Sequence, residues 1–407
     1  MKENVIVFLY LKNEPTAVPA GVFSYDEAER VGEFSYGARY IERPNALPAD
    51  PVSLPLGVKA LPTRLNEGFY GVIRDSLPDY WGRLVFAAKK QIAPEQLSII
   101  DLMLESNATR VGNLDFRLNP KSTEPKLELP YFTALEDIIE AAYRIENNEK
   151  VSKHILELYA QGSSMGGARP KCSVLFNNEM WIVKFPSKND TADIPLIEYA
   201  TMRLAAECGI DVPEVRLEKI GKKNVFMIKR FDRENTEQGF LRKGFMSALS
   251  LMQWDERDRY LWSYYSLADE MRKYMSVDNL KQLYRRMVFN SLVNNTDDHP
   301  RNHGFLTEGQ TINLSPAYDI VPTFKRQGIG SESSLAMSIG NLGRTISLEN
   351  ILSYFHMFGF KYEEDAVENC IKPLVAVVNR WKEYFDVYGV GSDTIQALQD
   401  TFFIVHL

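Results

Sequence analysis

Cysteine is scarce in this sequence, which carries only Cys172, Cys208 and Cys370 in 407 residues. Three cysteines so widely spaced exclude a disulfide framework and a Cys-based zinc site, and they favour a reducing compartment, for which the cytoplasm is the default expectation. A long apolar run is also lacking. The N-terminal apolar stretch ends before Lys12 and is too short for a signal peptide or a membrane-spanning helix. Its alternation over residues 5–9 predicts a strand instead.

An excess of positive charge is absent, because 47 Lys and Arg residues face 54 Asp and Glu residues and give a formal net charge of -7. This balance argues against a protein that coats nucleic acid through bulk electrostatics, so any contact with DNA is expected to go through a partner. Internal repeats and low-complexity tracts are lacking as well. With 45% hydrophobic and 25% charged residues, the chain is expected to form a globular protein of two or three packed domains.

Composition and periodicity divide the chain into three predicted domains, 1–130, 131–235 and 236–407. The first is rich in Pro, Gly and short alternating runs, with one helical signal over residues 74–90, RDSLPDYWGRLVFAAKK. We expect this helix to start at Ser76, which is a suitable N-cap. Prolines and turn residues in STEPKLELPYFTALED indicate the first boundary.

The second predicted domain alternates helices and hairpins. Its expected elements are a helix over 132–145, a hairpin over 171–184 with an NNE turn, a helix over 196–208 stopped by Gly209, and a hairpin over 212–235. After about residue 240 the pattern becomes mostly helical. We therefore predict an α+β fold in which a β-rich N-terminal part joins a helical C-terminal lobe.

Two features of the second domain are candidates for a nucleotide site. Residues 162–168, GSSMGGA, place glycines and serines just before a strand, where backbone N–H groups can wrap anionic oxygens, although a flexible surface loop has the same composition. Lys184 ends a strand, and Glu198 in the next helix offers the ion pair that positions nucleotide phosphates in kinase-type sites. The alternative for Lys184 is a strand-end lysine that reaches out to water.

The segment NNTDDHPRNHGFL at 294–306 follows a predicted helix and is unusually polar. Within it, Asn302 lies five residues after Asp297, the spacing by which kinase catalytic loops place a base and a metal ligand around one phosphoryl-transfer centre. Asp319, in LSPAYDIVPT, supplies a second metal-binding carboxylate. These oxygen ligands suit Mg²⁺, which is a hard cation.

A zinc hydrolase is a rival interpretation of the same segment. His299 and His303 are four residues apart, and Asp297 and Asp298 lie beside them, so all four could serve a first-row metal. Against this interpretation, Pro300 disfavours the continuation of a regular helix through His299, and the two histidines then need not share a face.

Together these segments resemble the HipA family of bacterial toxin–antitoxin Ser/Thr kinases, over nearly the whole length of the chain. IRDSLPDYWGR at 73–83 is similar to the family's N-terminal signature, and MIKRFDR at 227–233 to its link between lobes. SSMGGARPK at 163–171 resembles the phosphorylatable glycine loop, NTDDHPRNHGF the catalytic loop, and YDIVP the counterpart of the kinase DFG. The resemblance implies a two-lobed protein-kinase-like fold, of the phosphatidylinositol-kinase-like type.

The resemblance also implies a role for individual residues. In the phosphoryl-transfer centre, Asp297 would be the catalytic base, Lys184 the phosphate-pairing lysine, and Asn302 and Asp319 the Mg²⁺ ligands. The implied ATP contacts come from Gly166, Gly167, Ala168, Lys184, Glu198, Lys229, Phe231, Asp232 and His299. The hinge would run from Lys229 to Asp232, with main-chain groups that read adenine and with Asp232 near the ribose.

Ser164 aligns with the serine that such kinases phosphorylate on themselves to expel the glycine loop, and Ser163 is the adjacent alternative. The sequence departs from the family at Asp298, which stands where a small residue commonly follows the catalytic aspartate. We keep Asp297 as the base because it preserves the five-residue step to Asn302. Asp298 would then cap or orient the loop.

The implied protein is a cytoplasmic toxin kinase that uses ATP and Mg²⁺ and phosphorylates a translation-related protein of the aminoacyl-tRNA synthetase class. Its implied partners are a HipB-like helix-turn-helix antitoxin and, mainly through that antitoxin, operator DNA; no membrane contact is expected. Two alternatives stay open. One is a catalytically idle corepressor, although the intact catalytic set argues against lost activity. The other is a small-molecule kinase of the same fold, which has no need of the DSLPDYWGR segment.

Overall fold

The computed structural model of the protein describes residues 2–57, 59, 62–105, 109–122, 129–164, 166–325 and 333–405. The chain divides into two compact units. Unit 1 comprises Met1–Asn189, Glu218–Gln253 and Leu306–Thr311, and unit 2 comprises Asp190–Leu217, Trp254–Phe305 and Ile312–Leu407. The three-domain division expected from the sequence stays a prediction, and its first boundary follows residues 123–128, which lie outside the described residues.

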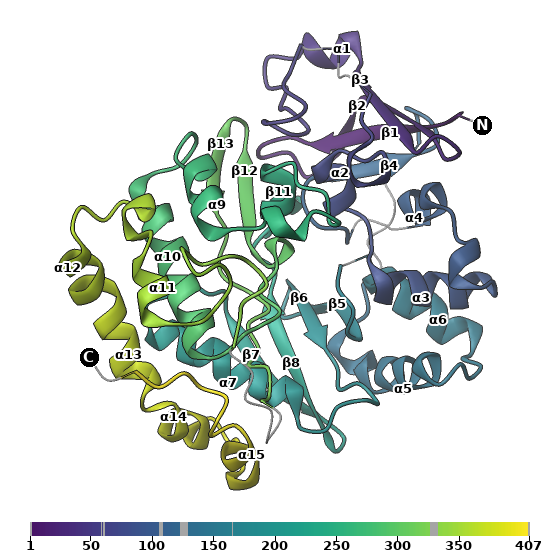
Figure 1. The fold of residues 1–407 in the computed structure, drawn as a ribbon. Helices are drawn as coiled ribbons and strands as arrows, with labels where there is room; N and C mark the ends of the chain where they lie inside the picture. The colour runs from purple at the N-terminus through teal and green to yellow at the C-terminus, as the bar shows by residue number, and fades with distance from the viewer. Residues whose placement is uncertain are drawn as a thin grey trace. The chain divides into compact units, whose positions relative to one another are not determined.

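Unit 1 begins with an antiparallel sheet of strand order β3-β2-β1-β4 (Figure 1). Its strands are β1 (Lys2–Tyr10), β2 (Ala17–Asp26), β3 (Val31–Tyr36) and β4 (Leu114–Arg117). β1 is paired on both sides, by β2 and by β4. The predicted strand is confirmed: Val5, Val7 and Leu9 are fully buried on one face, and Phe8 and Tyr10 are buried on the other.

The helical signal of residues 74–90 is divided between two helices, α2 (Gly71–Asp75) and α3 (Tyr80–Lys90). The predicted start at Ser76 is wrong, because Ser76 closes α2 and its hydroxyl donates to the Ile73 carbonyl at 2.7 Å. Pro78 explains the break, since a proline disfavours the helical conformation at the residue before it. The N-cap position of α3 is therefore Asp79.

A second sheet in unit 1 has strand order β5-β6-β8-β7, and its first three strands are antiparallel. The strands are β5 (Lys171–Phe176), β6 (Glu179–Lys184), β7 (Val215–Ile220) and β8 (Lys223–Lys229). The predicted hairpin of β5 and β6 is confirmed. Its turn places Asn177 and Asn178 at φ 50° and 60°, the left-handed pair that a two-residue hairpin turn requires and that asparagine tolerates.

Helices cover one face of this second sheet. They are α3, α4 (Ile99–Glu105), α5 (Leu135–Glu146) and α6 (Lys153–Gly162). One core joins them to the strands, with Trp81 and Val85 from α3, Tyr159 from α6, and Val174 and Val183 from β5 and β6, all buried. The remaining elements of unit 1 are α1 (Ala38–Ile41), β9 (Arg233–Thr236), β10 (Gly239–Arg242), β11 (Gly244–Ser247) and α8 (Ala248–Leu251).

Unit 2 is mostly helical, as predicted for the C-terminal part. Its helices are α7 (Ile194–Glu207), α9 (Tyr264–Met271), α10 (Val277–Leu292), α11 (Leu348–Leu352), α12 (Glu363–Ala366), α13 (Lys372–Val378), α14 (Trp381–Val387) and α15 (Ser392–Ala397). The strands β12 (Gly304–Glu308) and β13 (Thr311–Leu314) lie where the chain passes between units. α10 is held by its apolar stripe, because Leu283, Tyr284 and Met287 are fully buried.

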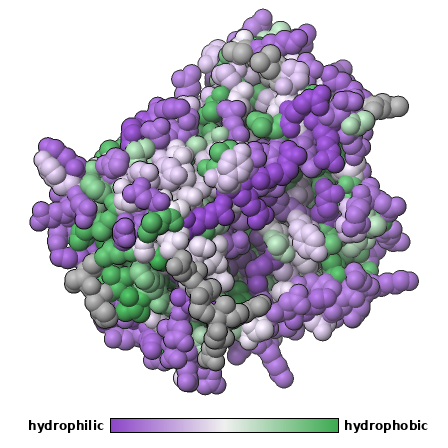
Figure 2. Space-filling model, in the orientation of Figure 1, coloured by the Kyte–Doolittle hydropathy of each residue, from purple (hydrophilic) through white to green (hydrophobic). Residues whose placement is uncertain are grey.

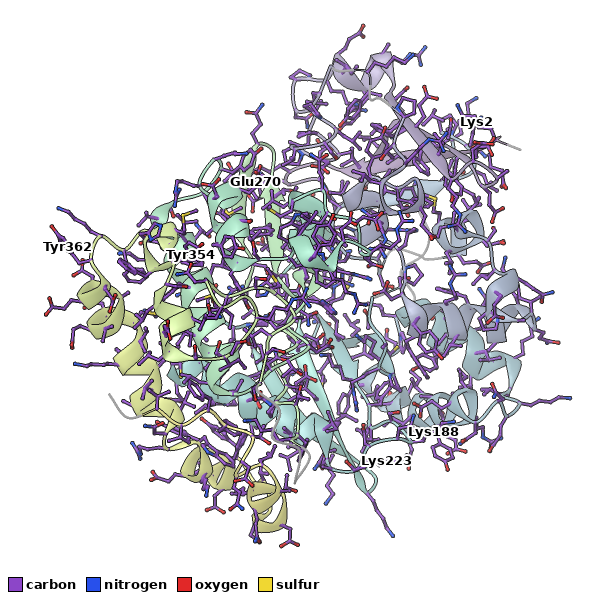
Figure 3. All side chains as sticks on the ribbon, viewed as in Figure 1. Lys2, Lys188, Lys223, Glu270, Tyr354 and Tyr362 are labelled. Carbon is purple, nitrogen blue, oxygen red and sulfur yellow. The ribbon has the colours of Figure 1, made fainter. Side chains whose placement is uncertain are left out.

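Polar side chains cover much of the face of the molecule seen in Figure 2. Figure 2 shows hydrophilic residues over most of the visible face, with smaller apolar areas among them. Charged side chains such as Lys2 of β1, Lys223 of β8 and Glu270 of α9 point away from the ribbon (Figure 3). Among the described residues, no helix is both long and apolar enough to cross a membrane.

Candidate functional site

The polar segment predicted as a catalytic loop leaves the end of α10 and is shaped by its own backbone. Asn294 turns the chain at φ 56°. The His299 amide donates to the Asp297 carbonyl at 2.9 Å, and a 3₁₀ turn follows over Pro300–Asn302. The Asn302 amide nitrogen Nδ2 also donates to the Asp297 carbonyl, at 3.0 Å. Because Nδ2 is committed there, Oδ1 is the atom of the Asn302 amide that suits a cation.

Asp297 and Asp298, adjacent in sequence, have opposite environments. Asp297 is exposed, whereas Asp298 is 1% exposed. The carboxylate of Asp298 contacts His303 Nε2 at 2.6 Å and accepts a hydrogen bond from the Tyr264 hydroxyl. Asn290 of α10 in turn donates to that hydroxyl at 3.2 Å. The orienting role expected for Asp298 agrees with this network, which ties the loop to α9 and α10 and leaves Asp297 facing outward.

A second set of hydrogen bonds ties the segment that follows Asp319 to the catalytic loop. The chain after Asp319 returns to the catalytic loop, where Thr323 accepts from Asn294 Nδ2 through its carbonyl at 2.8 Å and from the Thr296 hydroxyl through its own hydroxyl at 2.8 Å. Asp319 itself has φ 61°, a left-handed conformation that is uncommon outside glycine and asparagine. Such strained backbone is concentrated at functional sites.

Asp297 lies among charges of both signs. Loss of hydration raises the pKa of Asp297, and the carboxylates of Asp319 and Asp298 raise it further, against the opposing effect of His299 and Arg259. A bound cation would relieve the repulsion between Asp297 and Asp319. Carboxylate and amide oxygens are what Mg²⁺ prefers, so Asn302 and Asp319 fit the metal expected from the sequence.

The rival zinc site finds no support in the described part of the chain, where no group of three or more His, Cys, Asp or Glu side chains is arranged to hold a metal. His303 and Asp298 contact each other in the interior instead. Among the described residues, His299 has its Nδ1 buried without a hydrogen-bond partner, as His303 does. An unsatisfied ring nitrogen beside Asp297 suits the phosphate-side role expected of His299.

The two serines of the glycine loop in unit 1 are enclosed, whereas Gly166 and Gly167 are half-buried and Ala168 is exposed. Ser164 is 0% exposed and Ser163 is 2% exposed, and the Ser163 hydroxyl donates to the Tyr159 carbonyl at 2.8 Å. Gly167 has φ 110°, which a side chain would strain. Lys171 closes the loop from the strand side, since its Nζ donates to the Gly166 carbonyl at 2.8 Å. Neither serine is accessible to solvent in this position.

Lys184 lies at the end of β6, where it is 7% exposed and has its Nζ 5.8 Å from the centre of the Phe226 ring. In the register of the sheet it is opposite Lys171 on one side and Phe226 on the other. Glu198 is 1% exposed within α7. Lys184 belongs to unit 1 and Glu198 to unit 2, so their ion pair stays a prediction, as does the meeting of Lys184 with Asp297.

The hinge residues have a structural role that sequence reasoning missed. The Asp232 carboxylate is 4% exposed; its Oδ1 accepts from Arg230 Nε at 2.9 Å and its Oδ2 from Arg233 Nη1 at 2.8 Å and from the Gly112 amide at 2.9 Å. Burial alone would raise the pKa of Asp232, but the charges of Arg230 and Arg233 lower it well below its ordinary value. Both carboxylate oxygens are therefore engaged within the protein, and the implied ribose contact of Asp232 stays a prediction. Lys229 forms a half-buried ion pair with Glu179 at 3.1 Å.

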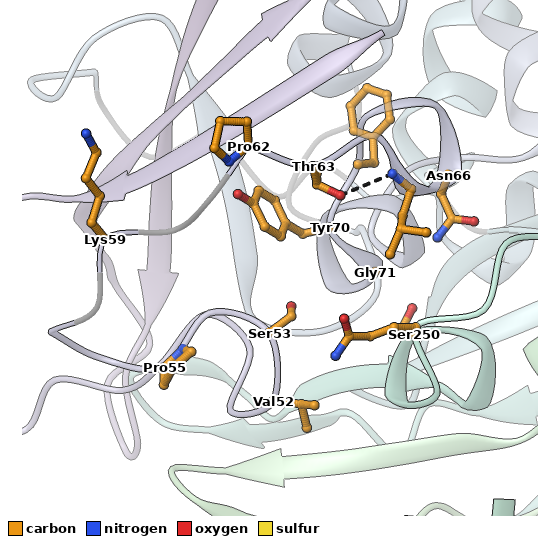
Figure 4. A pocket seen from close by; sticks show the side chains of 13 residues that line it. Val52, Ser53, Pro55, Lys59, Pro62, Thr63, Asn66, Tyr70, Gly71 and Ser250 are labelled. Atoms are coloured by element: carbon orange, nitrogen blue, oxygen red, sulfur yellow. Dashed lines mark hydrogen bonds between the residues drawn. The ribbon is translucent and has the colours of Figure 1, made fainter. Parts of the chain in front are cut away.

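Unit 1 also contains a cavity of about 440 Å³ that the sequence did not indicate (Figure 4). It is lined by residues of the first predicted domain, among them Ser53, Thr63 and Tyr70, together with Ser250 of α8. No residue predicted to bind nucleotide lines it. The cavity is therefore separate from the candidate phosphoryl-transfer residues.

Comparison with known proteins relates this arrangement to kinases. Residues 163–381 match the family model described as the HipA-like C-terminal domain. A putative kinase of Haemophilus influenzae is 26% identical over 209 residues, which cover 44% of this chain and 58% of that protein. The serine/threonine-protein kinase toxin HipA of Shewanella oneidensis is 25% identical over 205 residues, which cover 43% of this chain and 46% of that protein. The aligned region thus spans about half the length of these relatives.

One solved structure is similar to this protein over nearly its whole length. It is that of the Shewanella oneidensis MR-1 toxin–antitoxin system HipA, HipB and its operator DNA, with a TM-score of 0.63, 16% identity, and coverage of 98% of this chain and 94% of that chain. The likeness confirms the predicted two-lobed, kinase-like α+β fold. The family model spans more than half of the chain, and the protein therefore belongs to the HipA family of kinases.

Proposed function

We propose that the protein is an ATP- and Mg²⁺-dependent Ser/Thr protein kinase of the HipA toxin type. The observation that carries the proposal is that Asn302 is hydrogen-bonded to the Asp297 carbonyl and the Asp319 charge acts on Asp297, while the neighbouring Asp298 is turned inward by His303 and Tyr264. An idle protein has no need to keep an exposed carboxylate at the cost of an unfavourable neighbouring charge.

Asp297 has the position and the charge to act on the acceptor hydroxyl. It accepts the hydrogen bond of that hydroxyl, aligns it for attack and receives its proton, and a raised pKa favours the last step. Asn302 and Asp319 would hold Mg²⁺, which supplies neutralisation of the phosphoryl oxygens when bound. Position and charge, rather than strong basicity, are what this chemistry requires.

The nucleotide half of the proposal rests on unit 1. The loop of Gly166, Gly167 and Ala168 would surround the phosphates, and the buried ammonium of Lys184 would pair with them once Glu198 orients it. Phe231 and the main chain of Lys229 would bound the adenine. The proposal thus requires the two units to meet around one nucleotide.

The similarity to the Shewanella HipA structure is also the basis on which we propose binding partners. A HipB-like helix-turn-helix antitoxin is the expected inhibitor, because the similar Shewanella structure contains HipB and operator DNA. DNA contact would go mainly through that antitoxin, since the net charge of -7 disfavours direct binding. We further propose an aminoacyl-tRNA synthetase or another translation component as the substrate, and the cytoplasm as the location.

Transfer of labelled phosphate from Mg²⁺-ATP, with the purified protein alone and then with a bacterial lysate, tests the proposal. We expect label on the protein itself and on a discrete lysate protein, and none when the metal is chelated. A corepressor without activity would give no label in either reaction. A small-molecule kinase would label neither protein band but would consume ATP when an aminoglycoside or lipid is added.

Ser164→Ala is expected to abolish self-phosphorylation and to leave transfer to another substrate intact. The reason is that Ser164 lies in the glycine loop, away from Asp297 in the sequence and in a different unit, and serves only as an acceptor. Mass spectrometry of the peptide spanning residues 163–171 measures the effect. Ser163→Ala is the matched control and should retain the label. Undiminished label on this peptide in Ser164→Ala would show that Ser163 is the acceptor.

A further inference from the structure

We propose that Asp79 and Trp81, at the start of α3, form a clamp that positions the glycine loop for nucleotide and keeps Ser164 enclosed. The inference rests on the proposed kinase function and adds a role for the N-terminal segment DSLPDYWGR, to which the phosphoryl-transfer chemistry assigns none. In this view α3 is part of the nucleotide site although it contributes no group that touches the reacting atoms.

The first observation concerns the carboxylate of Asp79. An aspartate at an N-cap position usually accepts a hydrogen bond from an amide of its own helix. Asp79 occupies the N-cap of α3 but makes no such capping bond within the described residues 62–105. Its Oδ2 instead accepts from the Gly167 amide at 2.9 Å, across 88 positions of sequence. The Asp79 carboxylate therefore binds the glycine loop and does not cap its own helix.

The second observation is that Trp81 contacts the glycine loop from the same helix start. The Trp81 amide donates to the Gly167 carbonyl at 3.3 Å, so the peptide groups on both sides of Gly167 are bound by residues of one short stretch. The Trp81 indole Nε1 donates to the Tyr159 hydroxyl at 2.7 Å, within the last part of α6 that leads into the loop. The clamp thus holds both the entry to the loop and its glycine.

The aromatic part of the clamp is buried, whereas Asp79 and Gly167 are half-buried. Trp81 is 2% exposed and Tyr159 is 0% exposed. Tyr159 packs on Trp81 and on Phe185, with ring centroids 6.2 Å and 6.3 Å apart, and Phe185 directly follows Lys184. The Tyr159 carbonyl also accepts a hydrogen bond from the Ser163 hydroxyl. One packed group of aromatic rings therefore relates α3 to the two serines and to the strand of the phosphate-pairing lysine.

Two consequences follow for nucleotide binding and for self-phosphorylation. A loop that is already held in place loses little conformational freedom when ATP binds, so release of the clamp should weaken ATP binding. Since Ser164 is 0% exposed in the clamped loop, it becomes an acceptor only after Gly167 has separated from Asp79. The clamp therefore favours the ATP-binding state over the self-phosphorylated one.

Asp79→Asn in the full-length protein tests the clamp, with Glu105→Gln as the matched control. Glu105 pairs with Lys89 and Lys90 at the far end of α3 and has the same charge. We expect faster hydrogen exchange of the amides in residues 162–168 for Asp79→Asn, with exchange in β5 and β6 unchanged. The KM for ATP should rise roughly 10-fold, which is the usual effect of losing a charge-assisted hydrogen bond, with a smaller change in kcat. Glu105→Gln should match the unmodified protein in both measurements.

Trp81→Phe is the second variant, because it removes the indole donor while keeping an aromatic ring in the core. It should also speed exchange in the loop, to a smaller extent. Unchanged exchange in residues 162–168 for Asp79→Asn would overturn the clamp, and so would faster exchange spread over α3, α6 and β5, which indicates general loss of stability. Faster loop exchange with an unchanged KM for ATP would overturn the positioning role. Because exchange is measured without nucleotide, it decides on the clamp even if the unmodified protein transfers no phosphate.

Discussion

Replacement of Asp297 with asparagine should lower the rate of phosphoryl transfer by about 10²- to 10⁴-fold and leave the protein folded, because it removes the base that aligns the acceptor hydroxyl. Asp297 is exposed, and it experiences the repulsion of Asp319 and Asp298. Its removal therefore relieves an unfavourable charge interaction and costs little stability. Initial rates of label transfer and a thermal melt of the same preparation measure the two effects.

Asp298→Asn, at the adjacent residue, is the control. It should lower the stability of the protein and leave phosphoryl transfer largely intact. Asp298 is buried and contacts His303 and Tyr264. An amide has one acceptor oxygen, so one of these contacts is left unsatisfied in the interior, which costs about 1–3 kcal/mol of the free energy of unfolding. We expect a lower melting temperature for Asp298→Asn and an unchanged one for Asp297→Asn. Near-normal transfer by Asp297→Asn would remove this residue from the role of base.

Asp319→Asn should resemble Asp297→Asn in losing transfer, but for a different reason. An amide oxygen is a weaker ligand for Mg²⁺ than a carboxylate, so the rate should partly recover as the Mg²⁺ concentration is raised. No such recovery is expected for Asp297→Asn, since Asp297 is not assigned to the metal. The Mg²⁺ dependence of the initial rate therefore separates the base from the metal ligand.

The sequence predicted the elements whose signals are local. The hairpin of β5 and β6 follows from an Asn-Asn turn between two apolar runs, and α7 ends before Gly209 as expected. The start of α3 was misplaced at Ser76, because Ser76 and Asp79 are both good N-caps and only the effect of Pro78 on the residue before it separates them. Local sequence signals thus predicted these helices and strands correctly. They misplaced the start of α3, where two N-cap residues lie close together.

Pairings between distant segments were not predictable from one sequence. Nothing in the vicinity of Asp298 identifies Tyr264, 34 positions earlier, as its partner. The contact of Asp79 with Gly167 spans 88 positions, and the environment of Asp232 depends on Gly112, 120 positions away. The motif spacing could therefore name Asp297, Asn302 and Asp319 as candidates, but only the fold shows which neighbouring acids are structural.

Two arginine side chains surround the Asp232 carboxylate. Replacement of Asp232 is therefore expected to have a large effect on stability. Arg230 and Arg233 pair with it, and both also donate to carbonyls of the loop at residues 109–112. Both guanidinium groups are about 1% exposed. Burial lowers the pKa of Arg233 far below its ordinary value, and the nearby charge of Arg230 lowers it further. Asp232 is thus the counter-charge that makes the buried arginines tolerable.

Asp232→Asn should lower the free energy of unfolding by about 3–5 kcal/mol, since it leaves two buried cations without their anion. Glu234→Gln, an exposed neighbour in β9, is the control and should stay within about 0.5 kcal/mol of the unmodified protein. Denaturant titration measures both. If Asp232 were instead a ribose ligand at the surface of the site, Asp232→Asn would weaken ATP binding with little loss of stability.

The pH dependence of the stability difference between the unmodified protein and Asp232→Asn gives a second test. The pKa of Asp232 is lowered in the folded protein, so its contribution to stability is fully present above the ordinary aspartate pKa of about 4 and is lost as the pH falls through the lower folded value. The stability gap between the unmodified protein and Asp232→Asn should therefore be constant from neutral pH down to about 4 and narrow only in stronger acid. A gap that closes between pH 7 and about 5 would mean that Asp232 is not held ionised by Arg230 and Arg233.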